Sequence, residues 1–157
     1  MQMKEFDREF VERTKWIIQN VNCQFEVTLL LNCMLGLVNL PTVRTGKSKN
    51  EFQTKCIQKM HDMGVLTDDV ENIDHDKTFR AVRNAVSHLH ICPTSMGDSI
   101  EKIILSDMKG ENEPPHTQLE FTVDQLREFA LFVADKHLER LGNLQRKTGQ
   151  TNISNPE

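Results

Sequence analysis

The chain lacks a run of apolar residues that could cross a membrane comfortably. Its most hydrophobic stretch, FEVTLLLNCMLGLVNL, is interrupted by Glu26, Asn32 and Asn39, whereas a membrane helix needs about 20 mostly apolar residues. We therefore expect this stretch to form a buried helix and expect no membrane partner. The N-terminal sequence MQMKEFDREF is charged and has no apolar core, so no secretory signal peptide is expected.

Cysteine pairing is also missing. The chain has four cysteines, but no two of them form a CxxC pair, and Cys23 and Cys33 fall inside expected helices. This distribution predicts reduced thiols in a cytoplasmic protein. With 157 residues and no visible repeat, the chain is expected to form one domain around one core. We place that domain at residues 1–142 and expect residues 143–157 to form a flexible tail, because they offer little that could dock.

A general excess of positive charge is absent. The formal net charge is −4, which argues against broad, sequence-independent coating of nucleic acid. Residues 41–60 are nevertheless basic, and acidic residues gather in the segment that follows, 61–78. Such blocks are usually solvated surface. A functional alternative is that Arg44, Lys47 and Lys49 hold an RNA backbone.

Apolar periodicity predicts a bundle of about five helices. Four of these are expected in the first part of the chain, at about residues 6–21, 23–40, 50–64 and 76–91. The fourth must stop near Ile91, because Pro93 pushes Cys92 out of helical geometry.

Residues 98–123 change to the period of strands. The segments SIEKIILSDM and HTQLEFTV flank a turn-rich KGENEPP and predict a short β-hairpin. Thr122 and Gln125 predict a capping pair for the last helix, which Gly142 is expected to end. The predicted fold class is therefore all-α, a helical bundle with a short β-hairpin before its last helix.

The fourth helix carries the polar residues from which a function can be argued, in the stretch RNAVSHLH. At about 100° per residue, Val82, Val86 and Leu89 form a buried stripe. The polar face carries Arg80, Arg83, Asn84, Ser87 and His88. His90 falls at the edge of the buried stripe, where it would pack or cap, so His88 is the better candidate for an exposed imidazole. A polar face of this kind is also normal for an ordinary amphipathic helix.

A metal site is an alternative use of the same segment. His88, His90 and Cys92 alternate, which would align three ligands on one face of an extended strand. The helical pattern, however, continues to Leu89 and sends the two histidines to different faces, and no fourth ligand stands nearby in the sequence. We therefore expect neither a metal ion nor a cofactor.

The fourth helix, FRAVRNAVSHLHI, resembles the signature helix of the HEPN superfamily (higher eukaryotes and prokaryotes nucleotide-binding). In that signature an arginine and a polar residue precede a histidine, with four to six positions between the arginine and the histidine. The second helix, FEVTLLLNCMLGLVNLP, is similar to the corresponding helix of small stand-alone HEPN proteins from plasmids and mobile elements. The hairpin followed by TVDQLREFA fits the same plan, and the likeness covers roughly residues 5–142.

The resemblance implies a metal-independent endoribonuclease that leaves 2′,3′-cyclic phosphate ends. Arg83 and His88 match the catalytic pair and Asn84 matches the polar position, although the spacing also permits His90. The implied protein is a homodimer with an RNA substrate and a toxin or phage/mobile-element defence role, and the implied further partner is an antitoxin or regulatory protein. Some relatives have lost catalysis, so a dimeric module that binds RNA, nucleotide or a partner protein is the alternative. A purely structural helical protein is the third hypothesis.

Arginine and histidine suit RNA cleavage without a metal ion. Imidazole accepts and donates protons near neutrality, and guanidinium holds two phosphate oxygens while remaining cationic. Asn84, Ser87 and Arg80 are expected to support the catalytic pair. One pair provides only one proton-transfer group, so we expect a two-fold axis to bring a second copy of the helix to the site.

One branch of the superfamily differs from this sequence. In toxins controlled by a nucleotidyltransferase antitoxin, a tyrosine two positions after the histidine is adenylylated. That position is His90 here, and the chain contains no tyrosine. Silencing by adenylylation is therefore not expected.

Overall fold

The computed structural model describes residues 3–40, 47–67, 73–97, 99–108 and 117–151. The helices in this part of the chain are α1 (Met3–Asn20), α2 (Glu26–Val38), α3 (Lys47–Asp62), α4 (His75–Ser87) and α5 (Val123–Thr151). The strands are β1 (Ile91–Met96), β2 (Ser99–Asp107) and β3 (Thr117–Thr122). The mostly helical class predicted from the sequence is confirmed in outline, with a small sheet before the last helix.

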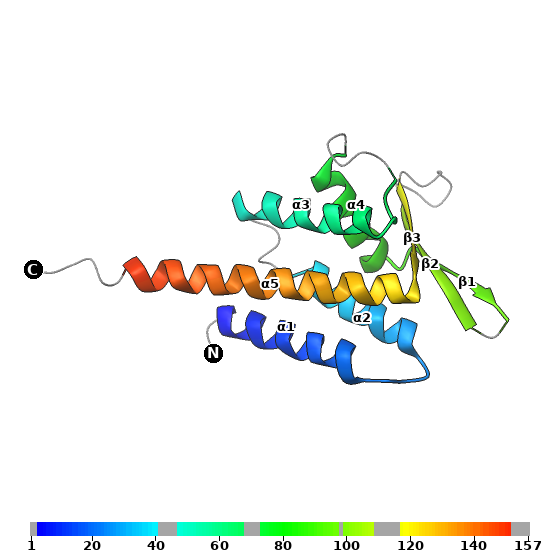
Figure 1. Ribbon diagram of the computed structural model, residues 1–157, viewed down its shortest axis with the longest axis horizontal. Helices are drawn as coiled ribbons and strands as arrows, with labels where there is room; N and C mark the ends of the chain where they lie inside the picture. The colour runs from blue at the N-terminus through cyan, green and yellow to red at the C-terminus, as the bar shows by residue number, and fades with distance from the viewer. Residues whose placement is uncertain (1–2, 41–46, 68–72, 98, 109–116, 152–157) are drawn as a thin grey trace, which may run out of the picture.

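The long helix α5 is the axis around which the other elements pack. It contacts α1, α2, α3, β2 and β3. Figure 1 shows α1 and α2 on one side of α5, α3 and α4 on the other, and the sheet at one end. The apolar faces of these elements form one continuous core, in which Phe79, Phe121 and Phe129 are among the largest buried side chains.

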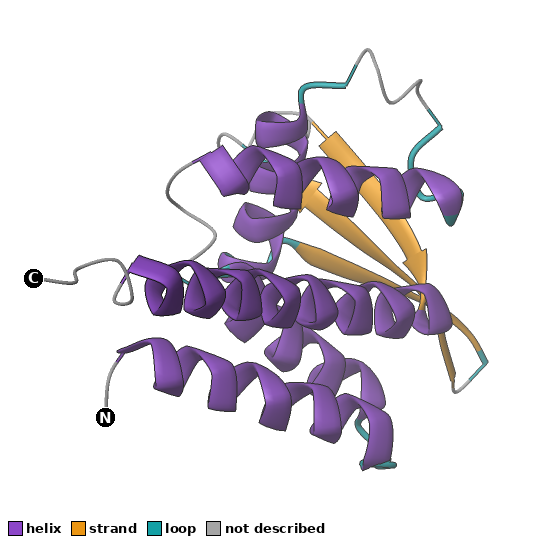
Figure 2. Cartoon of the chain, turned by 60° about the vertical axis from the view of Figure 1, so that its left-hand side comes forward, coloured by secondary structure: helices purple, strands orange, loops and turns teal. Residues whose placement is uncertain are grey.

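The sheet contains one strand more than the predicted hairpin. Its order is β1-β2-β3 and its pairs are antiparallel, and Figure 2 shows the strands side by side at the end of the helical bundle. The sequence pattern missed β1 because most of this edge strand is exposed and alternates no apolar residues. Pro93 is tolerated there because an edge strand does not need every backbone N–H.

Helix α4 ends earlier than predicted. Ser87 is its last residue and His88 is its C-cap. Leu89 adopts a left-handed conformation, with φ 56°, and the N–H of His90 donates to the Ala85 carbonyl at 2.9 Å. This is a Schellman cap. Leu89 continued the apolar period in the sequence, but its side chain is 73% exposed, so it is not part of the core.

The sequence predictions for the two ends of α5 had different outcomes. The predicted capping pair is confirmed, since the Gln125 N–H donates to Thr122 Oγ1 at 3.1 Å and the Gln125 side chain accepts from the Thr122 N–H at 2.8 Å. Gly142, in contrast, does not end the helix, which continues to Thr151. One glycine costs a helix only about 1 kcal/mol, so packing of the preceding turns can carry the helix through it.

The start of α3 also differs from the prediction. The helix begins at Lys47 rather than near Asn50, and it ends at Asp62, just before Gly64. Gly64 has a φ of 73°, the left-handed conformation that glycine commonly adopts after the end of a helix. Among the described residues, no helix combines the length and the apolar character that a membrane crossing requires.

Candidate functional site

The site is built on the C-terminal half of α4, which packs between α2, α3 and the sheet. The buried face of α4 carries Phe79, Ala81, Val82, Ala85 and Val86. On the remaining surface, Arg80, Ser87 and His88 are exposed, while Arg83 and Asn84 are half-buried. The predicted division of this helix into an apolar and a polar face is therefore confirmed up to Ser87.

Two polar residues of this face fasten α4 to its neighbours. Asn84 Nδ2 donates to Asp107 Oδ1 at 3.2 Å, which links the helix to the end of β2. Ser87 Oγ accepts from Asn39 Nδ2 at 2.9 Å, which links it to the end of α2. No local sequence pattern pointed to Asn39 or Asp107 as partners of α4, because both contacts join residues far apart in the chain.

The two arginines of the face differ in their partners. Arg80 Nη2 lies 4.0 Å from Asp76 Oδ2 on the preceding turn of the same helix. Arg83 is half-buried and, among the residues that the structure describes, makes neither a hydrogen bond nor an ion pair. Its charge is therefore available to an anion, whereas the charge of Arg80 is partly used within the helix.

His88 and His90 lie together, contrary to the prediction that they point to different faces. Their ring centres are 5.8 Å apart and their planes are inclined by 31°. The reason is the early end of α4: the left-handed Leu89 turns the chain, so His90 does not follow the helical period. His88 is exposed, and His90 is half-buried with its Nδ1 atom inside the protein.

Cys92, the third residue of the alternating pattern His88, His90 and Cys92, does not complete a metal site with the two imidazole rings. Cys92 lies exposed on β1, and its Sγ is 4.0 Å from the carbonyl oxygen of Pro93. Across the described ranges, no three side chains of histidine, cysteine, aspartate or glutamate are grouped in a way that could hold a metal ion.

The predicted RNA-binding lysines and arginine are only partly placed. Lys47 and Lys49 lie in the first turns of α3, but their side chains are outside what the structure describes. Arg44 is itself outside the described residues. Their role in holding RNA stays a prediction.

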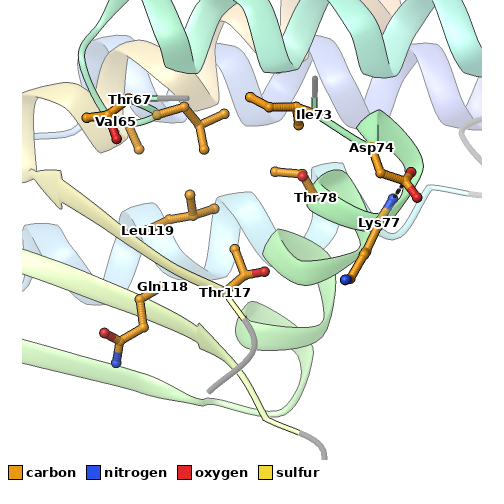
Figure 3. Close-up of a pocket in the computed structure, with 10 residues that line it drawn as sticks. Val65, Thr67, Ile73, Asp74, Lys77, Thr78, Thr117, Gln118 and Leu119 are labelled. Carbon is orange, nitrogen blue, oxygen red and sulfur yellow. Dashed lines mark hydrogen bonds between the residues drawn. The ribbon is translucent and has the colours of Figure 1, made fainter. Parts of the chain in front are cut away.

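A hollow of about 490 Å³ opens at the other end of α4 (Figure 3). It lies between the N-terminal turns of α4 and the start of β3, with Ile73, Thr78 and Leu119 among its lining residues. The Asp74 carboxylate already accepts the Lys77 N–H at 3.0 Å, so the helix N-terminus is occupied by an anion of the chain itself. At about 1.5 Å per helical residue, this hollow is roughly 16 Å along the axis from His88 and forms no part of the histidine site.

The bundle arranged around a long last helix, with a small antiparallel sheet before that helix, defines the class as a mostly helical protein. The family is assigned by comparison with family models. The chain matches the model described as HEPN pEK499 p136 over residues 1–143, and it belongs to this family. The resemblance inferred from the sequence is thereby confirmed. Comparisons with curated proteins and with solved structures gave no match.

Proposed function

We propose that the protein is a metal-independent endoribonuclease in which Arg83 and His88 act on the scissile phosphate. The observation that supports this most is the half-buried Arg83, which has no partner among the described residues and lies on the same end of α4 as an exposed imidazole. A guanidinium with no partner among the described residues keeps its N–H donors free, and its planar fork suits two oxygens of a phosphate.

RNA supplies its own nucleophile. Its 2′-hydroxyl attacks the adjacent phosphorus, the bond to the 5′-oxygen breaks, and a 2′,3′-cyclic phosphate and a 5′-hydroxyl form. His88 transfers a proton in this reaction. Arg83 holds the phosphoryl oxygens through its planar fork and stabilises the negative charge that develops on them. Asn84 and Ser87 support the pair by fixing α4 to β2 and α2, and Arg80 adds positive charge one turn away.

The active form in this proposal is a homodimer. Two exposed leucines flank the Asn39–Ser87 contact: Leu35, which is 36% exposed, and Leu89, which is 73% exposed. Asn39 Nδ2 also donates to the Leu35 carbonyl at 2.9 Å, so the end of α2 and the turn after α4 form one surface. Pairing of two copies through this surface would bring two Arg83–His88 pairs together.

The proposal is tested by incubating purified protein with a structured RNA in excess chelator. We expect products that end in 2′,3′-cyclic phosphate, and we expect His88→Ala and Arg83→Ala each to abolish most cleavage while the melting temperature is retained. Equal cleavage by the His88→Ala variant would disprove the assignment. Retarded migration of RNA without cleavage would instead support a non-catalytic binding module.

A toxin or defence role is tested in cells. We expect expression of the wild-type chain to arrest growth, and we expect His88→Ala to remove this effect. An antitoxin or regulatory partner would then be sought as a protein that restores growth to cells expressing the wild-type chain.

A further inference from the structure

We propose that His90 is the second proton-transfer residue of the same site, so that one chain provides both the general base and the general acid. This inference rests on the proposed ribonuclease activity and goes beyond it. It replaces the requirement that a second copy of the chain supply the second imidazole.

The spacing of the two rings carries the inference. Their centres are 5.8 Å apart, and among the described residues no hydrogen bond joins them. In phosphoryl transfer the attacking and leaving oxygens lie on opposite sides of phosphorus, roughly in line. A proton acceptor and a proton donor for these oxygens must therefore lie a few ångströms apart, and each must reach its own oxygen at about 2.6–3.2 Å. Two imidazoles at this separation meet that requirement.

The backbone between the histidines is arranged to bring them together. Had α4 continued, residues two positions apart would point about 200° apart around the helix. The left-handed Leu89, at φ 56°, prevents this. A leucine is sterically disfavoured in that conformation, where glycine or asparagine is usual. The chain therefore holds an uncommon conformation at the one residue that decides whether the two rings share a site.

Hydrogen bonds hold the backbone of His90 on both sides. The backbone N–H of His90 donates to the Ala85 carbonyl at 2.9 Å, and the His90 carbonyl accepts from the Ser106 backbone N–H at 3.0 Å. These bonds attach it to both the last turn of α4 and to β2. Its Nδ1 atom is buried and no described residue bonds to it. Nε2 is then the ring nitrogen that can reach a substrate.

The proposed step is balanced in atoms and protons. One neutral imidazole accepts the proton of the 2′-hydroxyl as the bond between O2′ and phosphorus forms. The other imidazole, protonated beforehand, gives its proton to O5′ as the bond between phosphorus and O5′ breaks. The two rings end with their protonation states exchanged, and proton exchange with water restores them. Arg83 holds the phosphoryl oxygens throughout.

A pair of substrates separates the two proton transfers. The dinucleotide UpA has an alkoxide leaving group that needs a proton, whereas uridine 3′-(p-nitrophenyl phosphate) releases a nitrophenolate that does not. We expect His88→Gln and His90→Gln each to lower kcat/KM for UpA by about 100-fold or more. For the nitrophenyl ester, the variant that lacks the general acid should keep near wild-type activity, and the variant that lacks the general base should not.

The outcomes distinguish this inference from the proposed function. Wild-type activity of His90→Gln on UpA would overturn the inference alone, as would an equal loss on both substrates by both variants, because that pattern indicates a structural role. His90→Asn is the second variant, since its shorter amide can reach the buried position of Nδ1. No cleavage of structured RNA by the wild-type chain would overturn the proposed function and this inference together, because no reaction would remain in which either histidine transfers a proton.

A mixed oligomer tests whether the two groups come from one chain. Wild-type and His88→Ala/His90→Ala chains would be co-expressed with different tags and isolated through both tags. If each chain carries its own pair, the mixed species should keep about half the wild-type activity. An inactive mixed species would show that the site is shared between chains and would overturn the inference.

Discussion

Two regions of this protein place histidine in opposite surroundings. His137 lies inside α5 with no exposed surface, its Nε2 is 2.9 Å from the Leu37 carbonyl oxygen, and its ring is 4.8 Å from that of Phe52. His88 lies exposed at the turn after α4, beside His90. A leucine follows both His137 and His88 in the sequence, so neighbouring residues do not distinguish them. The comparison teaches that the tertiary surroundings decide whether an imidazole is buried in the core or exposed to solvent.

The largest effect on RNA cleavage is expected for substitution of Arg83, the cation at the same end of α4 as His88. We expect Arg83→Gln to lower kcat/KM for RNA about 100- to 1000-fold, because a fixed charge aimed at the phosphate is lost. The change should leave the melting temperature nearly unaltered, since Arg83 makes no bond with another described residue. Steady-state cleavage of a short RNA and thermal unfolding provide the two measurements.

Arg80 offers the matched control for this prediction. It carries the same charge on the same helix, but it is exposed and its Nη2 lies 4.0 Å from Asp76 Oδ2. Arg80→Gln should therefore change kcat/KM by only a few fold. Equal losses in the two variants would mean that general positive charge, rather than one guanidinium at the phosphate, supports the activity.

The next largest effect concerns the pH dependence of the free energy of unfolding and comes from the buried His137. Burial lowers the pKa of His137 to about 4, whereas an unfolded histidine has a pKa of about 6.5. The unfolded chain then binds more protons between these values, so the folded state loses stability as pH falls from about 6.5 towards 4. At pH 5 the loss from this group amounts to about 2 kcal/mol.

Urea unfolding at pH 7 and pH 5 measures this loss. The wild-type chain and His88→Gln should lose stability to a similar extent between the two pH values. His137→Gln should lose about 2 kcal/mol less, because the titrating group is gone, even though the variant itself is less stable than the wild type at pH 7. The same pH dependence in His137→Gln as in the wild type would contradict the contrast between the two regions.

The sequence predicted the structure correctly where the apolar period of a helix and its capping residues indicate the same element. Thr122 and Gln125 cap α5 as predicted, and the apolar positions of α4 up to Val86 are buried as predicted. The pattern failed at Leu89, whose apolar side chain fits the helical period but lies exposed beyond the end of the helix. The apolar period could not predict that His88 and His90 lie close together. Their proximity depends on the left-handed conformation of Leu89, which is usual for glycine but not for leucine.

Contacts between distant parts of the chain were equally hidden. Asn39 and Asp107 are ordinary polar residues in the sequence, and they acquire their role only by meeting Ser87 and Asn84 in the folded chain. The edge strand β1 is a further example, since it contains a proline and is mostly exposed. Its pairing with β2 is a tertiary contact rather than a local preference.

The smallest effect concerns the residue that joins the two histidines. Leu89 has a φ of 56° and its side chain is 73% exposed. A left-handed backbone costs a leucine roughly 1–2 kcal/mol, and glycine removes that strain while adding roughly 0.5–1 kcal/mol of unfolded-state entropy. Leu89→Gly should therefore raise the stability of the isolated chain by up to about 1 kcal/mol, or roughly 2–4 °C in melting temperature.

Gly64 provides the reverse control for Leu89. It has a φ of 73°, and a Cβ added there would meet nothing within 4 Å. Gly64→Ala therefore adds backbone strain of roughly 1–2 kcal/mol, which the lower unfolded-state entropy of alanine offsets in part, so the chain should lose up to about 1 kcal/mol of stability. If Leu89→Gly instead lowers stability, its side chain must make a stabilising contact. A loss that grows with protein concentration would assign that contact to a second copy of the chain, because only an intermolecular contact depends on concentration. A gain in stability accompanied by weaker RNA cleavage would show that the leucine holds the two imidazoles in place at the expense of the fold.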